Sequence, residues 1–219
     1  MGRDHDDGWN VTYRAVLFDA DGVVQRPAGV WRAEMAALIE PDADLDAFIA
    51  DVVAAERPCL VGTADFPTEL GRVLARWRSS TSIDTALSIW RDIIVDHEIL
   101  DAVGALRRDG VVCCVASNQH AQRAAYMRRQ LRYDDVFDRQ FYSCHVGCAK
   151  PDPAFFGAIV TSLAVPAEAI LFFDDHESNA AAAREVGIDG VHFAPNAGAA
   201  RLADLLRERG LAPDRMQRR

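Results

Sequence analysis

The sequence lacks an excess of positive charge and any long apolar run. Its 24 lysines and arginines are outnumbered by 33 aspartates and glutamates, which gives a formal net charge of −9. A chain of this charge is not drawn to nucleic acid or to an anionic membrane surface. No apolar stretch approaches the roughly 20 residues that cross a bilayer. We therefore expect neither nucleic acid nor a membrane among its partners.

Cysteine is scarce and unpatterned, and the N-terminus lacks the features of a signal. The 5 cysteines form an odd set without the spacing of a disulfide framework, which predicts reduced thiols and a cytoplasmic location. Cys144, His145 and Cys148 have the spacing of half a metal site, but no second half follows, so we interpret it as accidental. Residues 1–10 are acidic and polar, and we expect them to be a disordered leader rather than a secretory signal.

What the sequence does contain is a short strand pattern that ends in two acids. Ala15–Phe18 is apolar throughout, as expected for a strand that is buried on both faces. Asp19 and Asp21 follow at once, and Gly22 lets the chain turn sharply as it leaves the sheet. Taken alone, the pair of acids is equally consistent with a solvated loop, but burial would require a cation or hydrogen bonds to compensate them.

From residue 30 to residue 98 the pattern is helical, with no convincing strand. Apolar residues recur at helical spacing, and Pro41, Pro58 and Pro67 fall where helices should start or stop. Ser82 is a candidate N-cap. We predict a helical insert of about four helices over residues 25–97, and we assign its aromatic side chains to core packing rather than to a ligand box.

Beyond the insert, strands alternate with helices. Further apolar or partly apolar runs predict strands at Val111–Ala116, Phe141–Val146, Ile170–Phe173 and Val191–Ala194. The alternation predicts an α/β fold, in which residues 11–24 and 98–219 form a Rossmann-like parallel sheet with helices on both faces, plus the all-helical insert. The run that begins at Phe141 is partly polar, which is typical of a strand near the edge of a sheet.

Polar residues follow three of the predicted strands at the point where each strand ends. They are Asp19 and Asp21, Ser117 and Asn118, and Asp174 and Asp175. Because ligands of such sheets lie beyond the carboxyl ends of the strands, we expect these groups to form one site. Four carboxylates there repel one another unless a divalent cation is present. An all-oxygen set without histidine or cysteine at ligand spacing favours magnesium over zinc.

Lys150 and Ser117 complete the predicted chemistry. Magnesium readily binds phosphate oxygens, so a small phosphorylated metabolite is the natural substrate. Lys150 adds a fixed positive charge, and Ser117 adds a hydroxyl with adjacent backbone amides for an anion. A carboxylate nucleophile that forms an acyl-phosphate would split phosphoester hydrolysis into two easier displacements. A second acid would protonate the leaving alcohol and then take a proton from the attacking water.

The order and content of these motifs resemble the haloacid dehalogenase-like (HAD) superfamily. The four motifs are Asp19-Ala-Asp21-Gly-Val-Val, Ser117-Asn118, Lys150-Pro151 and Asp174-Asp175. The longer stretches around Lys150 and Asp174, including Asn179, resemble the small sugar-phosphate phosphatases of the family and the phosphatase domain of bifunctional epoxide hydrolases. C1-capped members of the family carry an all-helical insert between the first two motifs, so the resemblance implies that residues 25–97 form such a cap.

The resemblance also implies a role for each acid. Asp19 would be the nucleophile and a magnesium ligand. Asp21 would be the general acid/base, with its backbone carbonyl on the metal. Asp175 aligns with the direct metal ligand, and Asp174 with a ligand that acts through water or through another residue. The members of the family that cleave carbon–halogen bonds lack an acid at the position of Asp21, so its presence favours phosphoryl chemistry.

The remaining motif residues would hold the phosphoryl group. Ser117 would bind it, helped by the backbone amide of Asn118, and Lys150 would neutralise the charge that develops on it. The leading hypothesis is thus a magnesium-dependent phosphatase of small phosphate monoesters. A phosphomutase of the β-phosphoglucomutase type and a non-catalytic protein that binds a phosphorylated ligand or a partner remain as alternatives. The sequence leaves the substrate and the oligomeric state open.

Other polar residues near the motifs receive plainer interpretations. His176 and His120 are expected to be solvated loop histidines, although His120 lies close enough to Ser117 to contact a substrate. The arginines that follow are interpreted as a solvated helix face rather than a phosphate clamp; they are Arg123, Arg128, Arg129 and Arg132.

Overall fold

The core of the protein is a parallel β-sheet. The computed structural model describes residues 12–195 and 197–211, so the predicted leader and the last eight residues lie outside the described part. Its main sheet has five strands in the order β5-β4-β1-β6-β7. The strands are β1 (Ala15–Phe18), β4 (Val112–Ser117), β5 (Arg139–Tyr142), β6 (Ile170–Asp174) and β7 (Asp189–His192). The predicted α/β fold is confirmed, and the strand at Phe141 does lie at an edge.

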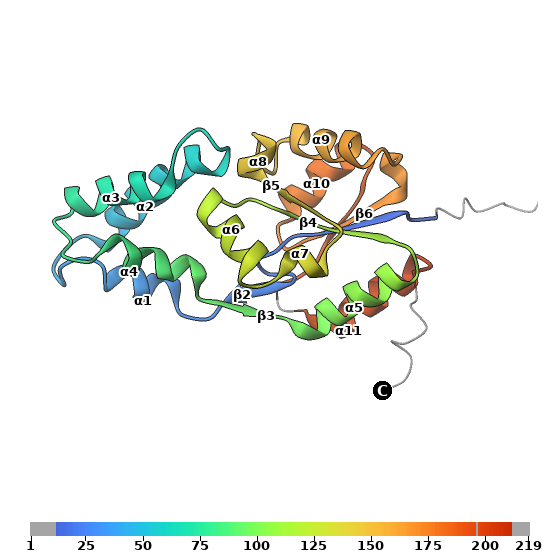
Figure 1. Cartoon of the computed structure of the whole chain (residues 1–219), viewed down its shortest axis with the longest axis horizontal. Coiled ribbons are helices and arrows are strands. Elements are labelled where there is room, and N and C mark those ends of the chain that lie inside the picture. Colours follow the sequence, from blue (N-terminus) through green and yellow to red (C-terminus); the bar gives the residue numbers. More distant parts are fainter. Residues whose placement is uncertain (1–11, 196, 212–219) are drawn as a thin grey trace, which may run out of the picture.

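Helices cover both faces of this sheet (Figure 1). Successive side chains of each strand point to opposite faces, so each face packs its own set of strand residues against helices. On one face Val16 and Phe18 pack against α5 (His97–Arg108) and α11 (Gly198–Glu208). On the other face Ala15 and Leu17 pack with α9 (Pro153–Leu163) and α10 (Glu177–Glu185). All of these strand residues are fully buried, as the continuous apolar run predicts. Two shorter helices, α6 (Ala121–Arg129) and α7 (Tyr133–Val136), lie on the first face.

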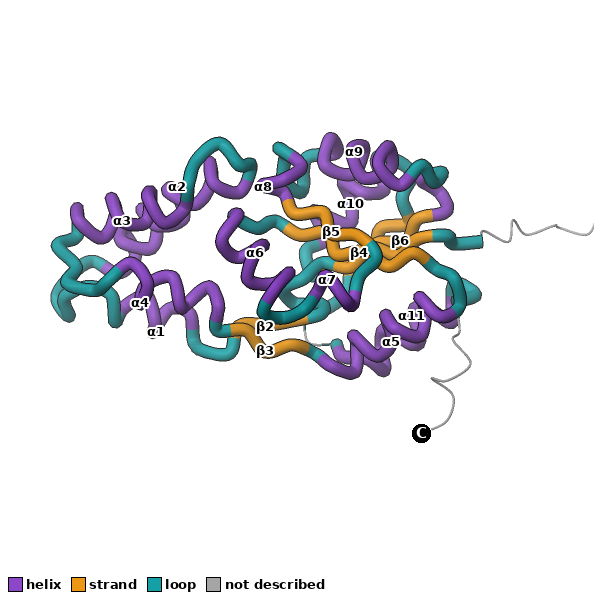
Figure 2. The backbone as a smooth tube through the Cα atoms, viewed as in Figure 1, coloured by secondary structure: helices purple, strands orange, loops and turns teal. Residues whose placement is uncertain are grey.

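The insert between β1 and β4 is helical, as predicted, and has a hydrophobic core of its own. Its helices are α1 (Trp31–Ala36), α2 (Leu45–Leu60), α3 (Phe66–Arg76) and α4 (Ile83–Ser88), followed by a 3-10 turn, η1 (Ile89–Arg91). Figure 2 shows these helices grouped at one end of the molecule, beyond the sheet. Its aromatic side chains pack on one another, so the predicted packing role is confirmed; Phe48 meets Trp77 edge-on, and Phe66 meets Trp90 in the same way.

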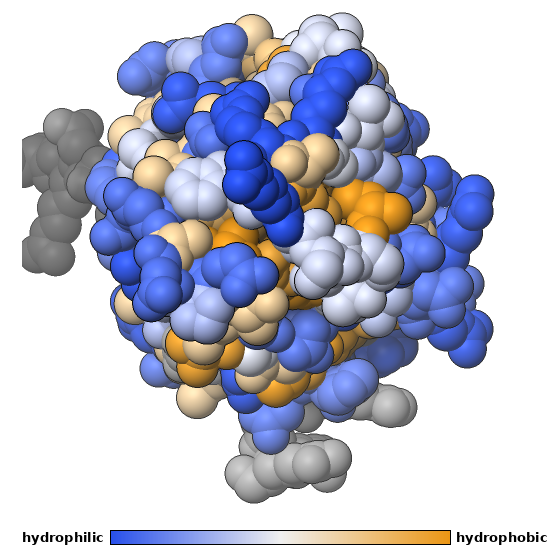
Figure 3. Space-filling view, turned by 90° about the vertical axis from the view of Figure 1, so that its left-hand side faces the viewer, coloured by the Kyte–Doolittle hydropathy of each residue, from blue (hydrophilic) through white to orange (hydrophobic). Residues whose placement is uncertain are grey.

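Short polar side chains start the insert helices. Asp44 caps α2 by accepting a hydrogen bond from the amide of Ala47, and Asp65 caps α3 in the same way. Ser82 caps α4 by accepting from the amide of Thr85, which confirms the predicted helix entry. The outer end of the insert is mostly hydrophilic, with separate apolar patches between polar side chains (Figure 3). No helix in the described ranges is long and apolar enough to span a bilayer.

Three local predictions were wrong. β2 (Gln25–Pro27) and β3 (Ile93–Val95) form an antiparallel ribbon that leads into and out of the insert, although no strand was expected between residues 30 and 98. Three residues are too few for a periodicity to show. Ser143–Val146 is a helix, α8, and not the end of a strand. The pairing of β5 ends at Tyr142 because its neighbour β4 ends opposite, at Ser117.

The third wrong prediction concerns Pro58, which lies inside α2 instead of ending it. Pro58 has no amide to donate to the carbonyl four residues earlier, and the helix ends soon after it, at Leu60. The backbone carbonyl of Pro58 then accepts hydrogen bonds from the amide and hydroxyl of Thr63. Pro58 therefore lies near the end of the helix but does not end it.

Candidate active site

The carboxyl ends of three neighbouring strands bring the predicted motifs together. Phe18 of β1 lies in register with Val115 of β4 and with Phe173 of β6, so the residues that follow in each strand meet at one edge of the sheet. A cavity of about 300 Å³ opens there. It is lined by Asp19, Asp21, Ser117, Asn118, Lys150, Pro151, His176, Ser178 and Asn179. The first three motifs therefore meet at this cavity. Asp174 and Asp175 are not among its lining residues, although Asp174 adjoins it through Lys150.

A larger cavity of about 400 Å³ lies beside the β2–β3 ribbon. It is lined by Gly22, Val23, Gln25, Arg26, Ile94, Val95, Asp96, His97, Glu98 and Gly198. The chain's buried carboxylates and its buried lysine are absent from this lining. We therefore assign the chemistry to the smaller cavity at the strand ends.

Lys150 stands between two buried carboxylates. Its Nζ atom is 2.8 Å from Asp19 Oδ1 and 2.6 Å from Asp174 Oδ2. The side chains of Lys150, Asp19 and Asp174 are 1%, 10% and 0% exposed. Buried charges of this kind are tolerated only when they are paired. Lys150 is the sole lysine of the chain, and its compact ammonium fits between the two acids as a single point of charge.

These contacts set the ionisation of the pair. Burial raises the pKa of Asp19 to about 6; Lys150 opposes the rise, and the charge of Asp174 adds to it. Burial alone would lower the pKa of Lys150, but the two carboxylates outweigh it, so the net pKa of Lys150 is raised. Lys150 is therefore a permanent cation. Asp19 Oδ1 is buried and makes no hydrogen bond of good geometry among the described residues, although it lies close to Lys150 Nζ.

Asp21 has a very different environment, because four donors surround its carboxylate. Arg123 donates to both oxygens, at 2.6 Å to Oδ2 and 2.8 Å to Oδ1. Gln25 donates to Oδ1 and Gln119 donates to Oδ2, at 3.1 and 3.0 Å. Burial would raise the pKa of Asp21, but the charge and hydrogen bonds of Arg123, with those of the two glutamines, lower it below its ordinary value.

The loop after β4 links the acids to the phosphate-binding candidates. Ser117 Oγ accepts a hydrogen bond from Gln119 Nε2, the same group that contacts Asp21. Asn118 binds the backbone of Lys150 through both ends of its amide, at 2.9 and 2.8 Å. The side chain of Asn118 therefore fixes the segment that carries Lys150.

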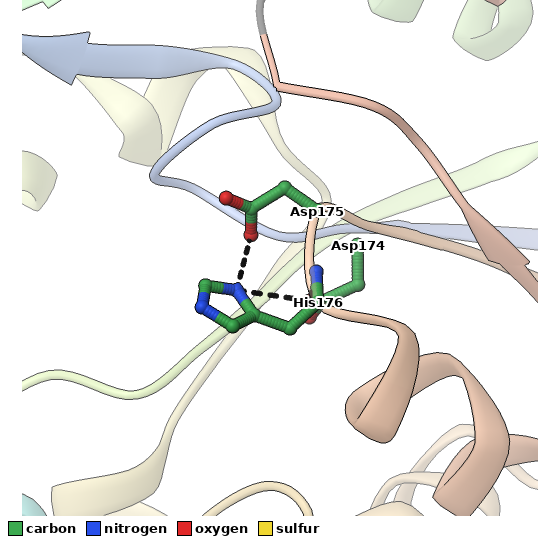
Figure 4. Close-up of side chains that lie close together, drawn as sticks. All are labelled: Asp174, Asp175 and His176. Carbon is green, nitrogen blue, oxygen red and sulfur yellow. Dashed lines mark hydrogen bonds and ion pairs between the residues drawn. The ribbon is translucent and has the colours of Figure 1, made fainter.

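The loop after β6 holds Asp174, Asp175 and His176 close together (Figure 4). Asp174 Oδ1 accepts from the amide of His176 and from the side chain of Asn179, at 2.8 and 2.9 Å. Asp174 is thus fully engaged from within the protein. Asp175 is freer, since His176 Nδ1, 2.7 Å from its Oδ1, is a solvent-exposed partner. Gly22 is required beside it, because a side chain there would overlap the carboxylate of Asp175.

Two predictions about the helix after β4 were wrong. Arg123 is not on a solvated face: its side chain is 13% exposed and holds Asp21. His120 is not solvated either, since it is 1% exposed and packs against Phe66 and Trp90 of the insert. Burial lowers the pKa of His120 to about 3, helped by the positive charges of Arg123 and Arg91. Arg128 and Arg132 do form exposed ion pairs, with Asp134 and Asp135.

Sequence reasoning missed the residues that surround Asp21. Gln25, Gln119 and Arg123 are polar residues without a motif, and only their distance from Asp21 and Ser117 along the chain could have drawn attention to them. The cysteines behave as predicted. All five are free thiols. Among the described residues, the potential metal ligands that lie close together as a group of three are Asp174, Asp175 and His176. Cys144, His145 and Cys148 do not form such a group.

Comparison with known proteins assigns a family to this arrangement. The family model of the haloacid dehalogenase-like hydrolases matches residues 13–187. Among curated proteins, drimenol cyclase drtB of Aspergillus calidoustus is 41% identical over 58 residues, which is 26% of this chain and 11% of that protein. Bifunctional epoxide hydrolase 2 of Rattus norvegicus is 26% identical over 98 residues, 43% of this chain and 18% of that protein. The match thus spans less than a fifth of these relatives.

Solved structures share the fold over most of the chain. A HAD family enzyme of Bacteroides thetaiotaomicron, in complex with magnesium and inorganic phosphate, has a TM-score of 0.75 at 18% identity and covers 87% of this chain and 98% of its own. The L-2-haloacid dehalogenase of Xanthobacter autotrophicus has a TM-score of 0.57 at 16% identity, over 81% of this chain and 76% of its own. At these identities the likeness concerns the fold.

Proposed function

The chain belongs to the haloacid dehalogenase-like hydrolases, and we propose that it is a magnesium-dependent phosphatase of small phosphate monoesters that works through an aspartyl-phosphate. One observation carries the proposal: Asp19 and Asp21 line the same cavity as Ser117 and Lys150. A cavity of about 300 Å³ is in the range of small-molecule sites. Since the cysteines are free thiols, we also propose a cytoplasmic location.

In the proposed reaction Asp19 is the nucleophile. A carboxylate oxygen of Asp19 attacks phosphorus, and the bond from phosphorus to the ester oxygen breaks. Asp21, which must carry a proton at this stage although Arg123 favours its ionised form, gives that proton to the departing oxygen. Water then attacks the phosphorus of the aspartyl-phosphate and gives a proton to Asp21, and the bond from phosphorus to Asp19 breaks. The products are an alcohol and inorganic phosphate, and both aspartates return to their starting states. Lys150, with Ser117 and the amide of Asn118, stabilises the charge on the transferring group.

Carboxylate oxygens are the ligands that magnesium prefers, and Asp19, Asp174 and Asp175 offer them at neighbouring strand ends. The oxygens of Asp174 and Asp175 lie close together, with His176. Asp19 lies outside that group, and its Oδ1 is 2.8 Å from Lys150 Nζ. Asp19 and Asp175 would hold the ion by their side chains, Asp21 by its backbone carbonyl, and Asp174 indirectly. The ion would neutralise the phosphate and the nucleophile as they meet. The magnesium and phosphate bound by the Bacteroides enzyme support this proposal.

Dehalogenation is the competing chemistry in this family, and a dehalogenase is among the structural relatives. It needs no acid to protonate a leaving oxygen, because a halide leaves without a proton. Asp21 lines the cavity together with Asp19, where an acid could give a proton to a leaving oxygen. Asp21 therefore favours phosphate esters over haloacids.

The test is release of inorganic phosphate from a panel of sugar phosphates and other phosphorylated metabolites. We expect turnover with magnesium that is lost with a chelator. We expect Asp19→Asn to lose at least about 10⁴-fold in kcat with the fold retained. Asp42→Asn, at an exposed position in the insert, is the matched control. Near-normal hydrolysis by Asp19→Asn would reject the proposal, and an isomerised sugar phosphate with little free phosphate would indicate a mutase.

A further inference from the structure

The four hydrogen bonds on Asp21 are of two kinds. The two from Arg123 are short, charged and come from one rigid guanidinium group, at 2.6 and 2.8 Å. The two from Gln25 and Gln119 are longer and come from neutral amides, at 3.1 and 3.0 Å. A fork that binds both oxygens of a carboxylate fixes its plane, and it joins two opposite charges, whereas the amides of Gln25 and Gln119 carry none.

This difference shows which contact can give way during the reaction. A carboxylate has about four lone-pair positions, and all four are occupied here. A leaving oxygen or a water molecule that exchanges a proton with Asp21 must replace one of these donors. Replacing the amide of Gln25 or Gln119 is easier than breaking the fork, and it leaves the plane of the carboxylate fixed by Arg123.

Arg123 is itself fixed by the insert. Its Nε donates to the backbone carbonyl of Trp90 at 2.8 Å, and its Nη1 also donates to Gln119 Oε1 at 3.1 Å. Trp90 lies in η1, where the chain leaves the last helix of the insert. The indole of Trp90 donates in turn to Glu56 of α2. A continuous chain of contacts therefore runs from the insert through Arg123 to Asp21, and through Gln119 to Ser117.

We propose that Arg123 is a positioning residue. Its guanidinium orients the carboxylate of Asp21 for proton transfer, and it couples that orientation to the position of the helical insert. The inference rests on the proposed phosphatase function. It predicts that the proton-transfer steps, and not the binding of phosphate, depend on the fork of Arg123. The loss should therefore depend on how much the leaving group needs a proton.

The test compares phenyl phosphate with 4-nitrophenyl phosphate, which are close in size. Phenolate is the poorer leaving group and needs protonation by Asp21, whereas 4-nitrophenolate leaves readily without it. The value of kcat/KM reports the steps up to departure of the leaving group, whereas kcat includes hydrolysis of the aspartyl-phosphate, which is the same for both esters. Arg123→Lys keeps the positive charge but cannot form the fork, so it separates geometry from charge.

For Arg123→Lys we expect kcat/KM on phenyl phosphate to fall by about tenfold or more, and on 4-nitrophenyl phosphate by less than about threefold. Hydrolysis of the aspartyl-phosphate also needs an aligned base, so kcat should fall on both esters and 4-nitrophenolate should appear in an initial burst. Arg128→Lys on the same helix, where Arg128 forms an exposed ion pair with Asp134, is the matched control and should behave as wild type.

Equal losses of kcat/KM on the two esters, or none, in a folded Arg123→Lys variant would overturn the inference and leave the phosphatase proposal standing. A wild-type chain that hydrolyses neither these esters nor any phosphorylated metabolite of the panel with magnesium would overturn both. Thermal unfolding shows whether the variant is folded. If Arg123→Lys is not, Arg123→Gln, which keeps one donor without a buried positive charge, is measured in its place, with the same contrast between the esters expected.

Discussion

The edge of the sheet and the helical insert bury opposite kinds of side chain. The buried polar and charged residues of the described chain lie in the core or, for Gln25, where the chain enters the insert, and most gather around the active-site cavity; they include Asp19, Gln25, Ser117, Gln119, Lys150, Asp174 and Asn179. The buried residues of the insert are all apolar. Burial of apolar surface stabilises a fold, whereas burial of charge costs free energy unless pairing compensates it.

The two regions therefore differ in what their buried side chains do. The insert is built for packing, and its contact with the chemistry runs through a few groups at the junction, such as the carbonyl of Trp90 and the ring of His120. At the strand ends the burial of charge costs folding free energy, as it does for Lys150 between Asp19 and Asp174. Substitutions at the strand ends should therefore change activity most, and substitutions inside the insert should change stability most.

The largest effect is expected at Lys150. Lys150→Met leaves the buried carboxylates of Asp19 and Asp174 facing each other without their shared cation. We expect kcat to fall by about 10³-fold or more, since the charge on the transferring phosphoryl group also loses its stabilising partner. Phosphate release with magnesium measures this. Arg139→Met, at an exposed position of β5, is the control for loss of a positive charge. An equal loss of kcat in that variant would show that the effect of Lys150→Met does not come from a role of Lys150 in the reaction.

The second effect is on stability and lies in the insert. Phe48 is fully buried and packs edge-on against Trp77. Phe48→Ala should lower the free energy of unfolding by about 4 kcal/mol, through lost transfer energy and a cavity. Denaturant unfolding measures it. At a temperature where the variant is folded, kcat should stay within about threefold of wild type. A folded Phe48→Ala protein without activity would contradict this account, because it would show that packing inside the insert also controls the activity of the strand ends.

The smallest effect concerns His120 at the junction, where the two kinds of interior meet. Its pKa is lowered to about 3 in the folded protein, below the ordinary value of about 6.5. The unfolded chain therefore takes up a proton as the pH falls below about 6.5, while folded His120 stays neutral, so the folded state loses stability towards low pH. Between pH 7 and pH 5 this amounts to about 2 kcal/mol.

His120→Asn removes this titration while keeping a side chain that can cap α6, as His120 does through the amide of Arg123. We expect the variant to lose less stability than wild type between pH 7 and pH 5. Asp19, whose raised pKa of about 6 favours the folded state as the pH falls, acts in the opposite direction in both proteins and cancels in the difference. Identical pH profiles of unfolding for the two proteins would show that His120 is accessible to protons in the folded state.

The features that were predicted correctly are those carried by local pattern. The apolar runs at Ala15–Phe18 and Ile170–Phe173 form buried strands because a strand covered on both faces needs apolar residues throughout. In a parallel sheet the carboxyl ends of such strands lie at the same edge. The acids at the strand ends thereby fall at one edge, and the convergence of the motifs could be predicted without coordinates.

The features that were missed depend on the tertiary fold. Arg123 and Arg128 lie on the same helix, and nothing local distinguishes them, yet Arg123 faces the site and Arg128 faces solvent. The strand at Ile93–Val95 is three residues long and exists because it pairs with Gln25–Pro27, far away in the sequence. The end of β5 at Tyr142 is likewise set by its neighbour. Contacts of this kind have no signature in a single sequence.

The most direct measurement is the identification of a phosphorylated residue during turnover. The chain is mixed with a phosphate ester and magnesium, quenched in acid within one turnover, digested and examined by mass spectrometry. The proposed chemistry predicts one added phosphoryl group on Asp19 in wild type and none in Asp19→Asn. A phosphoryl group on another residue, or steady phosphate release by Asp19→Asn without any phosphorylated peptide, would contradict it.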